Sequence, residues 1–355
     1  MDSLSVEDLM RMTIKEGASD LHLTVGCPPA LRIDGQLRFL TALPVLKPED
    51  TLGFLRSLLT QEQMDRLDEE RDLDFPHTIP GVSRFRINAY HQRGCHAIAF
   101  RTIPKDVPTI EQLGLPSTLK GLALRPRGLV LVTGPTGVGK TTTLASMVKE
   151  VNRSKCIHIV TVEDPIEYLH PHERSIVNQR ELGTDVKTFA SGLRSALRED
   201  PDVIMVGEMR DLETTTTALT AAETGHLVMA SMHTRDAAST VDRVIDQFPS
   251  YQQQQIRTML SVTLEAVISQ QLLVRRGGNG RVAALEIMIA TPAVRNLIRE
   301  GKTHMIPNVI QTSTRYGMQT MDQALKDLCL HGIITYEEAM SHAFNPDELA
   351  KLLAS

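Results

Sequence analysis

The chain has 355 residues, enough for two domains of ordinary size, and its 41% hydrophobic and 23% charged residues are typical of a globular protein. Its net charge of −5 argues against a broadly basic surface, so we expect no direct nucleic-acid partner. No apolar run approaches the roughly 20 residues that span a bilayer, and the start MDSLSVEDLM lacks the basic region of a signal peptide. These features predict a cytoplasmic protein that reaches a membrane only through partners.

The four cysteines lie far apart and form no CxxC pair. This spacing argues against a metal site or a disulfide framework and favours reduced thiols.

Residues 1–101 predict a small α+β domain. Ser5 can cap a first helix, residues 21–25 and 30–33 form strands, and Asp34-Gly35 is a hairpin turn. A helical stretch follows at about residues 51–67.

A strand at residues 84–90 alternates apolar and polar side chains. Period two places Phe85, Ile87 and Ala89 on one face and Arg84 and Arg86 on the other. From the residues alone, the two arginines are either solvated surface charges or a pair presented to phosphates of a neighbouring subunit.

Prolines punctuate residues 102–118, which predicts an interdomain linker. Beyond it, strands alternate with helices, which is the pattern of a parallel α/β sheet. The predicted buried strands share short apolar runs and cover residues 129–132, 157–162, 203–206 and 227–232. We assign residues 119–291 to this core and residues 292–355 to a mostly helical C-terminal portion.

The stretch LVLVTGPTGVGKTT, residues 129–142, is a strand that runs into G-x-x-x-x-G-K-[ST], the phosphate-binding P-loop. Glycines let the backbone wrap a polyphosphate, Lys140 places a charge on the β- and γ-phosphates, and the Thr141 hydroxyl can ligate Mg²⁺. The predicted nucleotide-binding residues are Gly134, Pro135, Thr136, Gly137, Val138, Gly139, Lys140, Thr141 and Thr142. The chain is therefore predicted to bind a nucleoside triphosphate with Mg²⁺.

Acidic residues follow two of the later strands. Glu163 ends the second strand, and Glu208 comes two residues after the third. Because strand ends gather beside the triphosphate, these carboxylates can polarise the attacking water or bind Mg²⁺ through water. The alternatives are a helix cap or a surface charge.

Three further polar residues stand near the same strand ends. His233 follows the fourth strand, where a sensor of the γ-phosphate would lie, whereas His226 precedes that strand and is as well explained by a structural role. Arg210 is placed to reach the nucleotide or a subunit boundary. Arg194 on a predicted helix has acidic residues at 199, 200 and 202 as local ion-pair partners.

Four ordered motifs together resemble the secretion ATPase superfamily, which includes the type II and type IV secretion motors and the type IV pilus motors. GPTGVGKTT resembles its Walker A motif, VTVEDPIEY its Asp box, IMVGEMRD its Walker B motif and TGHLVMASMHT its His box. SDLHLTVGCPPALRIDG is similar to the N-terminal domain of these motors. The resemblance implies a PAS-like α+β domain followed by a RecA-like P-loop NTPase domain with a helical C-terminal portion.

Within the superfamily, the chain resembles the pilus-retraction ATPases of twitching motility. AVRNLIRE, residues 293–300, is similar to their AIRNLIRE motif, and the four-cysteine zinc element usual in extension and type II motors is absent from the sequence. The alternatives left open are an extension or type II secretion ATPase, or a nucleotide-gated regulatory subunit with little hydrolysis.

The resemblance further implies a homohexamer in which Arg84 and Arg86 contact phosphate, Glu163 activates water and Glu208 binds Mg²⁺ through water. It also implies that the chain is an ATP-hydrolysing motor located at the inner face of the cytoplasmic membrane. Its partners would be an inner-membrane pilus platform protein and a paralogous retraction ATPase.

Overall fold

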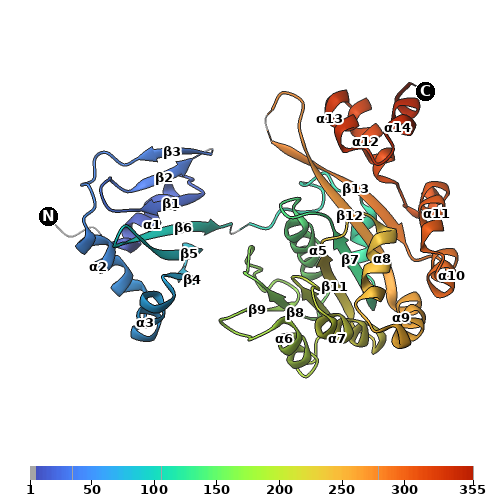
Figure 1. Ribbon diagram of the computed structural model, residues 1–355, viewed down its shortest axis with the longest axis horizontal. Helices are drawn as coiled ribbons and strands as arrows, with labels where there is room; N and C mark the ends of the chain where they lie inside the picture. Colours follow the sequence, from blue (N-terminus) through green and yellow to red (C-terminus); the bar gives the residue numbers. More distant parts are fainter. Residues whose placement is uncertain (1–4, 34, 105, 279, 355) are drawn as a thin grey trace. The chain divides into compact units, whose positions relative to one another are not determined.

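The structure, a computed structural model, describes residues 5–33, 35–104, 106–278 and 280–354. It divides into two compact units, Met1–Asp106 with Glu167–Leu169, and Val107–Ile166 with His170–Ser355. The boundary between them falls within the linker predicted at residues 102–118. Each unit is described by itself (Figure 1).

The first unit is built on a six-stranded sheet with the order β3-β2-β1-β6-β5-β4 and antiparallel pairing throughout. Its elements are α1 (Val6–Lys15), β1 (Asp20–Leu23), β2 (Ala30–Ile33), β3 (Gln36–Phe39), α2 (Pro48–Leu58), α3 (Gln61–Glu70), β4 (Asp72–Ile79), β5 (Ser83–Gln92) and β6 (Cys95–Ile103).

The local sequence explains several of these elements. The Ser5 hydroxyl accepts a hydrogen bond from the Asp8 amide at 3.1 Å, which caps α1 as predicted. The predicted alternation in β5 is confirmed, because Phe85, Ile87 and Ala89 are all fully buried. Strands β2 and β3 pair across the predicted turn, of which Asp34 lies outside the described residues.

The stretch predicted at 51–67 is helical, but it consists of two helices, α2 and α3. Leu59 is extended and the Thr60 hydroxyl accepts the amide of Gln63, so a new capping box starts the second helix. The strand predicted at 21–25 ends earlier, at Leu23, and β4 was not predicted.

The second unit is built on a seven-stranded sheet with the order β13-β12-β7-β11-β10-β8-β9. Neighbouring strands run parallel except β12 and β13, which form an antiparallel hairpin. Up to this hairpin its elements are α4 (Thr118–Ala123), β7 (Gly128–Thr133), α5 (Lys140–Ser154), β8 (His158–Glu163), β9 (Ile176–Glu181), α6 (Phe189–Ala196), β10 (Val203–Val206), α7 (Leu212–Glu223), β11 (Leu227–Met232), α8 (Ala237–Asp246), α9 (Ser250–Thr263), β12 (Leu264–Val274) and β13 (Arg281–Ile289).

Helices cover both faces of this sheet, which is why β7, β10 and β11 read as continuous apolar runs. One hydrophobic cluster joins the sheet to α4 and α5, and a second joins it to α6 through α11 (Figure 1). All four predicted strands are present. Strands β9, β12 and β13 were not predicted.

The C-terminal portion is helical, as predicted (orange to red in Figure 1). It comprises α10 (Pro292–Glu300), η1 (Thr303–Met305), α11 (Ile306–Thr312), η2 (Thr314–Tyr316), α12 (Met321–Leu330), α13 (Tyr336–His342) and α14 (Pro346–Ala354). Helices α12, α13 and α14 share a hydrophobic cluster with the β12–β13 hairpin. Across the described ranges, every helix is too short or too polar to cross a bilayer.

Candidate nucleotide-binding site

The sheet register of the second unit brings the predicted motifs to one edge. Val206 of β10 lies between Val162 of β8 and Ala230 of β11, and β11 continues beside β7. The carboxyl ends of these parallel strands therefore release the P-loop, Glu163, Glu208 and His233 at the same edge, where ligands bind in open α/β sheets.

The P-loop depends on glycine for close backbone contact. Gly134 has φ of 139°, and a Cβ there would lie 2.4 Å from the carbonyl oxygen of Gln270. Gly139 has φ of 88° and immediately precedes α5, whose first residue is Lys140. Because a helix begins there, its unpaired N–H groups and positive dipole end lie beside the loop, as phosphate binding requires.

The Gln270 side chain of β12 supports the P-loop, and it is not among the predicted site residues. Its Nε2 donates to the Val138 carbonyl at 2.5 Å, and its Oε1 accepts from the Thr143 hydroxyl at 2.7 Å. The side chain is buried, so both amide groups need these partners. The available signal was an amide pair, residues 270–271, within a mostly apolar strand.

Lys140 and Glu208 are connected through His233. The Lys140 ammonium donates to the Gly134 and Pro135 carbonyls at 2.8 and 3.0 Å, and it lies 3.3 Å from His233 Nδ1. His233 Nε2 lies 2.8 Å from Glu208 Oε1. Since an ammonium can only donate, this network assigns the acceptor role to Nδ1 and the proton to Nε2. The lysine, the histidine and the acid predicted from three separate motifs are thus in contact.

Hydrogen bonds between β11 and the residues that follow β10 hold the backbone around Glu208 in place. The Ser231 hydroxyl donates to the Gly207 carbonyl at 2.5 Å, and the Met209 amide donates to the Ser231 carbonyl at 3.0 Å. Arg210 Nε lies 2.6 Å from Glu208 Oε1. Burial alone would raise the pKa of Glu208, but hydrogen bonds from Arg210 and His233 outweigh it and lower that pKa. The carboxylate is therefore ionised at neutral pH.

Glu163 is buried at the end of β8, so it is not a surface charge. The Thr161 hydroxyl donates to its Oε1 at 2.6 Å, and the Gln179 amide donates to the same oxygen at 3.0 Å. These two hydrogen bonds fix the orientation of the carboxylate. The arrangement suits a group that orients water or a hydrated cation.

The other predicted P-loop residues occupy the loop and the first turn of α5. Pro135, Thr136 and Gly137 are exposed, and Thr141 and Thr142 follow Lys140 in the helix. The Thr141 hydroxyl and the Glu208 carboxylate are hard oxygen donors of the kind that Mg²⁺ prefers, so this set fits the cation.

Arg84 and Arg86 lie on β5 of the first unit, and their phosphate contact stays a prediction. Arg86 lies 3.4 Å from Asp74 across the strand pair, and both side chains are largely exposed. For Arg86 this contact is an exposed ion pair, whereas the alternative expected from the residues was a solvated charge.

The contacts of His226 and Arg194 decide two further predictions. His226 Nδ1 lies 3.0 Å from the Ala221 carbonyl near the end of α7, which is a structural contact. The suggestion that Arg194 pairs with nearby acids is wrong in its partner, because Arg194 pairs with Glu213 of α7. The cause is that α6 packs against α7.

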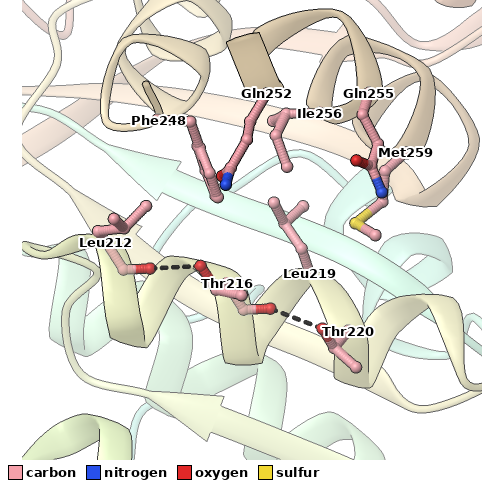
Figure 2. A pocket seen from close by; sticks show the side chains of 9 residues that line it. All are labelled: Leu212, Thr216, Leu219, Thr220, Phe248, Gln252, Gln255, Ile256 and Met259. Atoms are coloured by element: carbon pink, nitrogen blue, oxygen red, sulfur yellow. Dashed lines mark hydrogen bonds between the residues drawn. The ribbon is translucent and has the colours of Figure 1, made fainter. Parts of the chain in front are cut away.

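A separate pocket of about 270 Å³ lies between α7 and α9. Figure 2 shows Leu212, Thr216, Leu219 and Thr220 of α7 facing residues of α9 across it. None of its lining residues is charged. Because a triphosphate needs cations and backbone donors, the nucleotide site is assigned to the P-loop instead.

The fold and this site define a P-loop nucleotide-binding protein of the mixed α/β class. The chain belongs to the family described as Type II/IV secretion system protein, which matches residues 3–341. It is 50% identical to the type IV pilus retraction ATPase PilT of Pseudomonas aeruginosa, over 97% of this chain and 99% of that protein. It is 40% identical to the type IV pilus ATPase PilU of the same organism, over 99% of this chain and 91% of that one.

A crystal structure of the pilus retraction motor PilT with bound ADP superimposes with a TM-score of 0.92 at 49% identity. The match covers 98% of this chain and 100% of that one. The family and the mixed α/β fold inferred from the sequence motifs are thus confirmed.

Proposed function

We propose that this chain is an ATP-hydrolysing motor that powers type IV pilus retraction, and hence twitching motility. The observation that carries the proposal is the contact of Lys140, His233 and Glu208 beside a glycine-built P-loop. Similarity to PilT over nearly the full length of both chains supports retraction as the mechanical output.

The residues of the site divide the chemistry of hydrolysis among them. Lys140 and the N-terminus of α5 would stabilise charge on the β- and γ-phosphates, and Glu163 would orient the water for in-line attack. Thr141 and Glu208 would hold Mg²⁺, the latter through water, and the cation would supply charge neutralisation at the phosphates. His233 contacts both Lys140 and Glu208. Loss of the γ-phosphate beside Lys140 would therefore change the position of His233 and, through it, that of Glu208.

The finer architecture is part of the proposal. We assign the first unit to a PAS-like domain and the second to a RecA-like domain, and we propose that six chains form a ring. Arg84 and Arg86 would then contact the triphosphate, alongside Arg210. Their planar guanidinium groups are suited to phosphate, which supports this assignment. An experimental structure of the nucleotide-bound protein would test this architecture, which requires a hexamer with nucleotide at the subunit boundaries.

The partners would be an inner-membrane pilus platform protein and a PilU-like paralogue, with the motor at the cytoplasmic face of the membrane. The net charge of −5 supports protein rather than nucleic-acid partners. Co-purification of the chain with platform protein from detergent-solubilised membranes would test this, and loss of the complex at low salt would contradict it.

Two assays separate this function from its alternatives. A steady-state phosphate-release assay with Mg²⁺ and ATP should show turnover, whereas a regulatory subunit would bind ATP without hydrolysing it. Deleting the gene should leave cells hyperpiliated, because pili are extended and not withdrawn. An extension motor would instead leave cells without pili, and a type II secretion ATPase would leave piliation unchanged.

A further inference from the structure

Two histidines and an aspartate meet in the first unit, and none of the three is among the predicted nucleotide-binding residues. His91 of β5 and His96 of β6 are direct cross-strand partners, joined by a turn at Arg93 and Gly94 with φ of 49° and 76°. Side chains of paired residues lie on the same face of a sheet. The two imidazole rings accordingly meet edge to face with centroids 4.4 Å apart.

Asp68 of α3 completes the group. Its Oδ1 lies 3.5 Å from His91 Nε2 and 3.8 Å from His96 Nε2, and the three ligand atoms all lie within 4.8 Å of one another. The His91 amide donates to the Arg71 carbonyl at 3.0 Å, which ties the end of α3 to β5. A tetrahedral Zn²⁺ with bonds of about 2.0–2.2 Å holds its ligands roughly 3.3–3.6 Å apart. Small side-chain shifts would therefore bring this group to metal-binding distances.

The Nε2 nitrogens of the two histidines make no hydrogen bond within the described residues. Both Nε2 atoms are also shielded from solvent. Buried polar atoms without partners are costly and rare. Asp68 is 60% exposed, so a bound ion would keep an open side toward water.

We propose that Asp68, His91 and His96 form a binding site for a first-row divalent transition metal such as Zn²⁺. Two imidazoles and one carboxylate are ligands that such ions accept, with water in the remaining position. The cysteine spacing that argued against a metal site does not bear on it, because none of its ligands is a cysteine. The ion would link helix α3 to the β5–β6 hairpin.

Arg71 sets the affinity of this site. Its Nη1 lies 3.5 Å from His91 Nδ1, and a guanidinium can only donate. Metal binding at Nε2 places the proton on Nδ1, so the Arg71 head group must move away, which its exposed position allows. Replacing this cation should tighten metal binding.

The test is Zn²⁺ binding by the full chain, first treated with a chelator and kept free of nucleotide, measured by competition with a chromogenic chelator. We expect one Zn²⁺ per chain, and a rise in the unfolding temperature with Zn²⁺ concentration. His91→Ala and His96→Ala should weaken binding by roughly tenfold or more, since each removes one of three ligands. His77→Ala, on the neighbouring strand β4, should bind as the wild type does.

Two variants keep the test decisive if a histidine variant fails to fold. Asp68→Asn changes an exposed side chain and should weaken binding, whereas Arg71→Gln should strengthen it. Absence of Zn²⁺ binding by the wild type at micromolar concentration would overturn the proposal. So would equal affinity in wild type, Asp68→Asn and Arg71→Gln, because the ion would then be bound elsewhere.

Discussion

The Gln270 side-chain amide donates to the Val138 carbonyl inside the P-loop at 2.5 Å, so β12 fixes the shape of a loop that lies 132 residues earlier in the chain. Gln270→Glu replaces the donor with a carboxylate that repels this carbonyl. A cavity is not created, because the two side chains have nearly the same size. We expect ATP affinity to fall by roughly tenfold, which corresponds to one lost buried hydrogen bond.

The matched control for this variant is Gln271→Glu. Gln271 follows on the same strand, but its amide contacts His342 of α13 instead of the P-loop. A fluorescent ATP analogue would report both affinities. Equal weakening in the two variants would show that the bond to Val138 does not shape the site.

His233 should matter for turnover more than for binding. His233→Ala removes the contact between Lys140 and Glu208, while the P-loop backbone that holds the phosphates is unchanged. We expect kcat to fall by about 10²-fold, with KM for ATP within a few-fold of the wild type. His226→Ala, at the other end of β11, is the control and should keep both constants. A KM effect as large as the kcat effect would instead assign His233 to nucleotide binding.

Substitutions of Arg86 and of Asp74 can distinguish a phosphate contact of Arg86 from its ion pair with Asp74. The pair is exposed, so neither Arg86→Ala nor Asp74→Ala should cost more than about 1 kcal/mol of stability. If Arg86 contacts phosphate, Arg86→Ala should lower phosphate release at least about tenfold, whereas Asp74→Ala should not. Identical phosphate-release rates in the two variants would show that Arg86 does not contact phosphate and makes only the surface ion pair.

Glu286 makes the stability of the second unit depend on pH. It is buried on β13, where it accepts the Ala237 amide at 2.8 Å at the start of α8. Burial, and then repulsion from Asp236 and Asp322, raises its pKa from 4.5 to about 7. Because the folded chain holds this proton more tightly than the unfolded chain, the stabilisation is complete below pH 4.5 and is lost as the pH rises to about 7.

Over that range the wild type should lose roughly 3 kcal/mol of unfolding free energy through this group. Glu286→Gln keeps an oxygen for the Ala237 amide and cannot ionise, so its denaturation curves should change less between pH 4.5 and 7. The exposed Glu223→Gln variant is the control and should follow the wild type. If Glu286→Gln also follows the wild type, Glu286 does not carry the dependence.

Much of the site could be predicted because its motifs are local. Each motif occupies about ten residues: a glycine pattern with a lysine, or an acid at the end of an apolar strand. A parallel sheet then brings the strand ends together. Gln270 could not be found this way, because its importance depends on β12 lying beside β7. The break at Thr60 was missed because helix periodicity continues across it, although Thr60 and Gln63 together form a capping box.

The pairing of His91 with His96 has a similar origin. Only the observed register of β5 and β6 places the two side chains opposite each other. Asp68 lies on α3, one residue beyond the helical stretch predicted at 51–67. Non-local contacts of this kind depend on tertiary packing, which a single sequence does not specify.

The central claim is that Glu208, joined to Lys140 through His233, serves ATP hydrolysis. The most direct test is steady-state phosphate release by Glu208→Gln with saturating Mg²⁺ and ATP, compared with the exposed Glu213→Gln. We predict that Glu208→Gln loses at least about 100-fold in turnover while still binding ATP, and that Glu213→Gln stays near the wild-type rate. A Glu208→Gln rate close to the wild type would contradict the account.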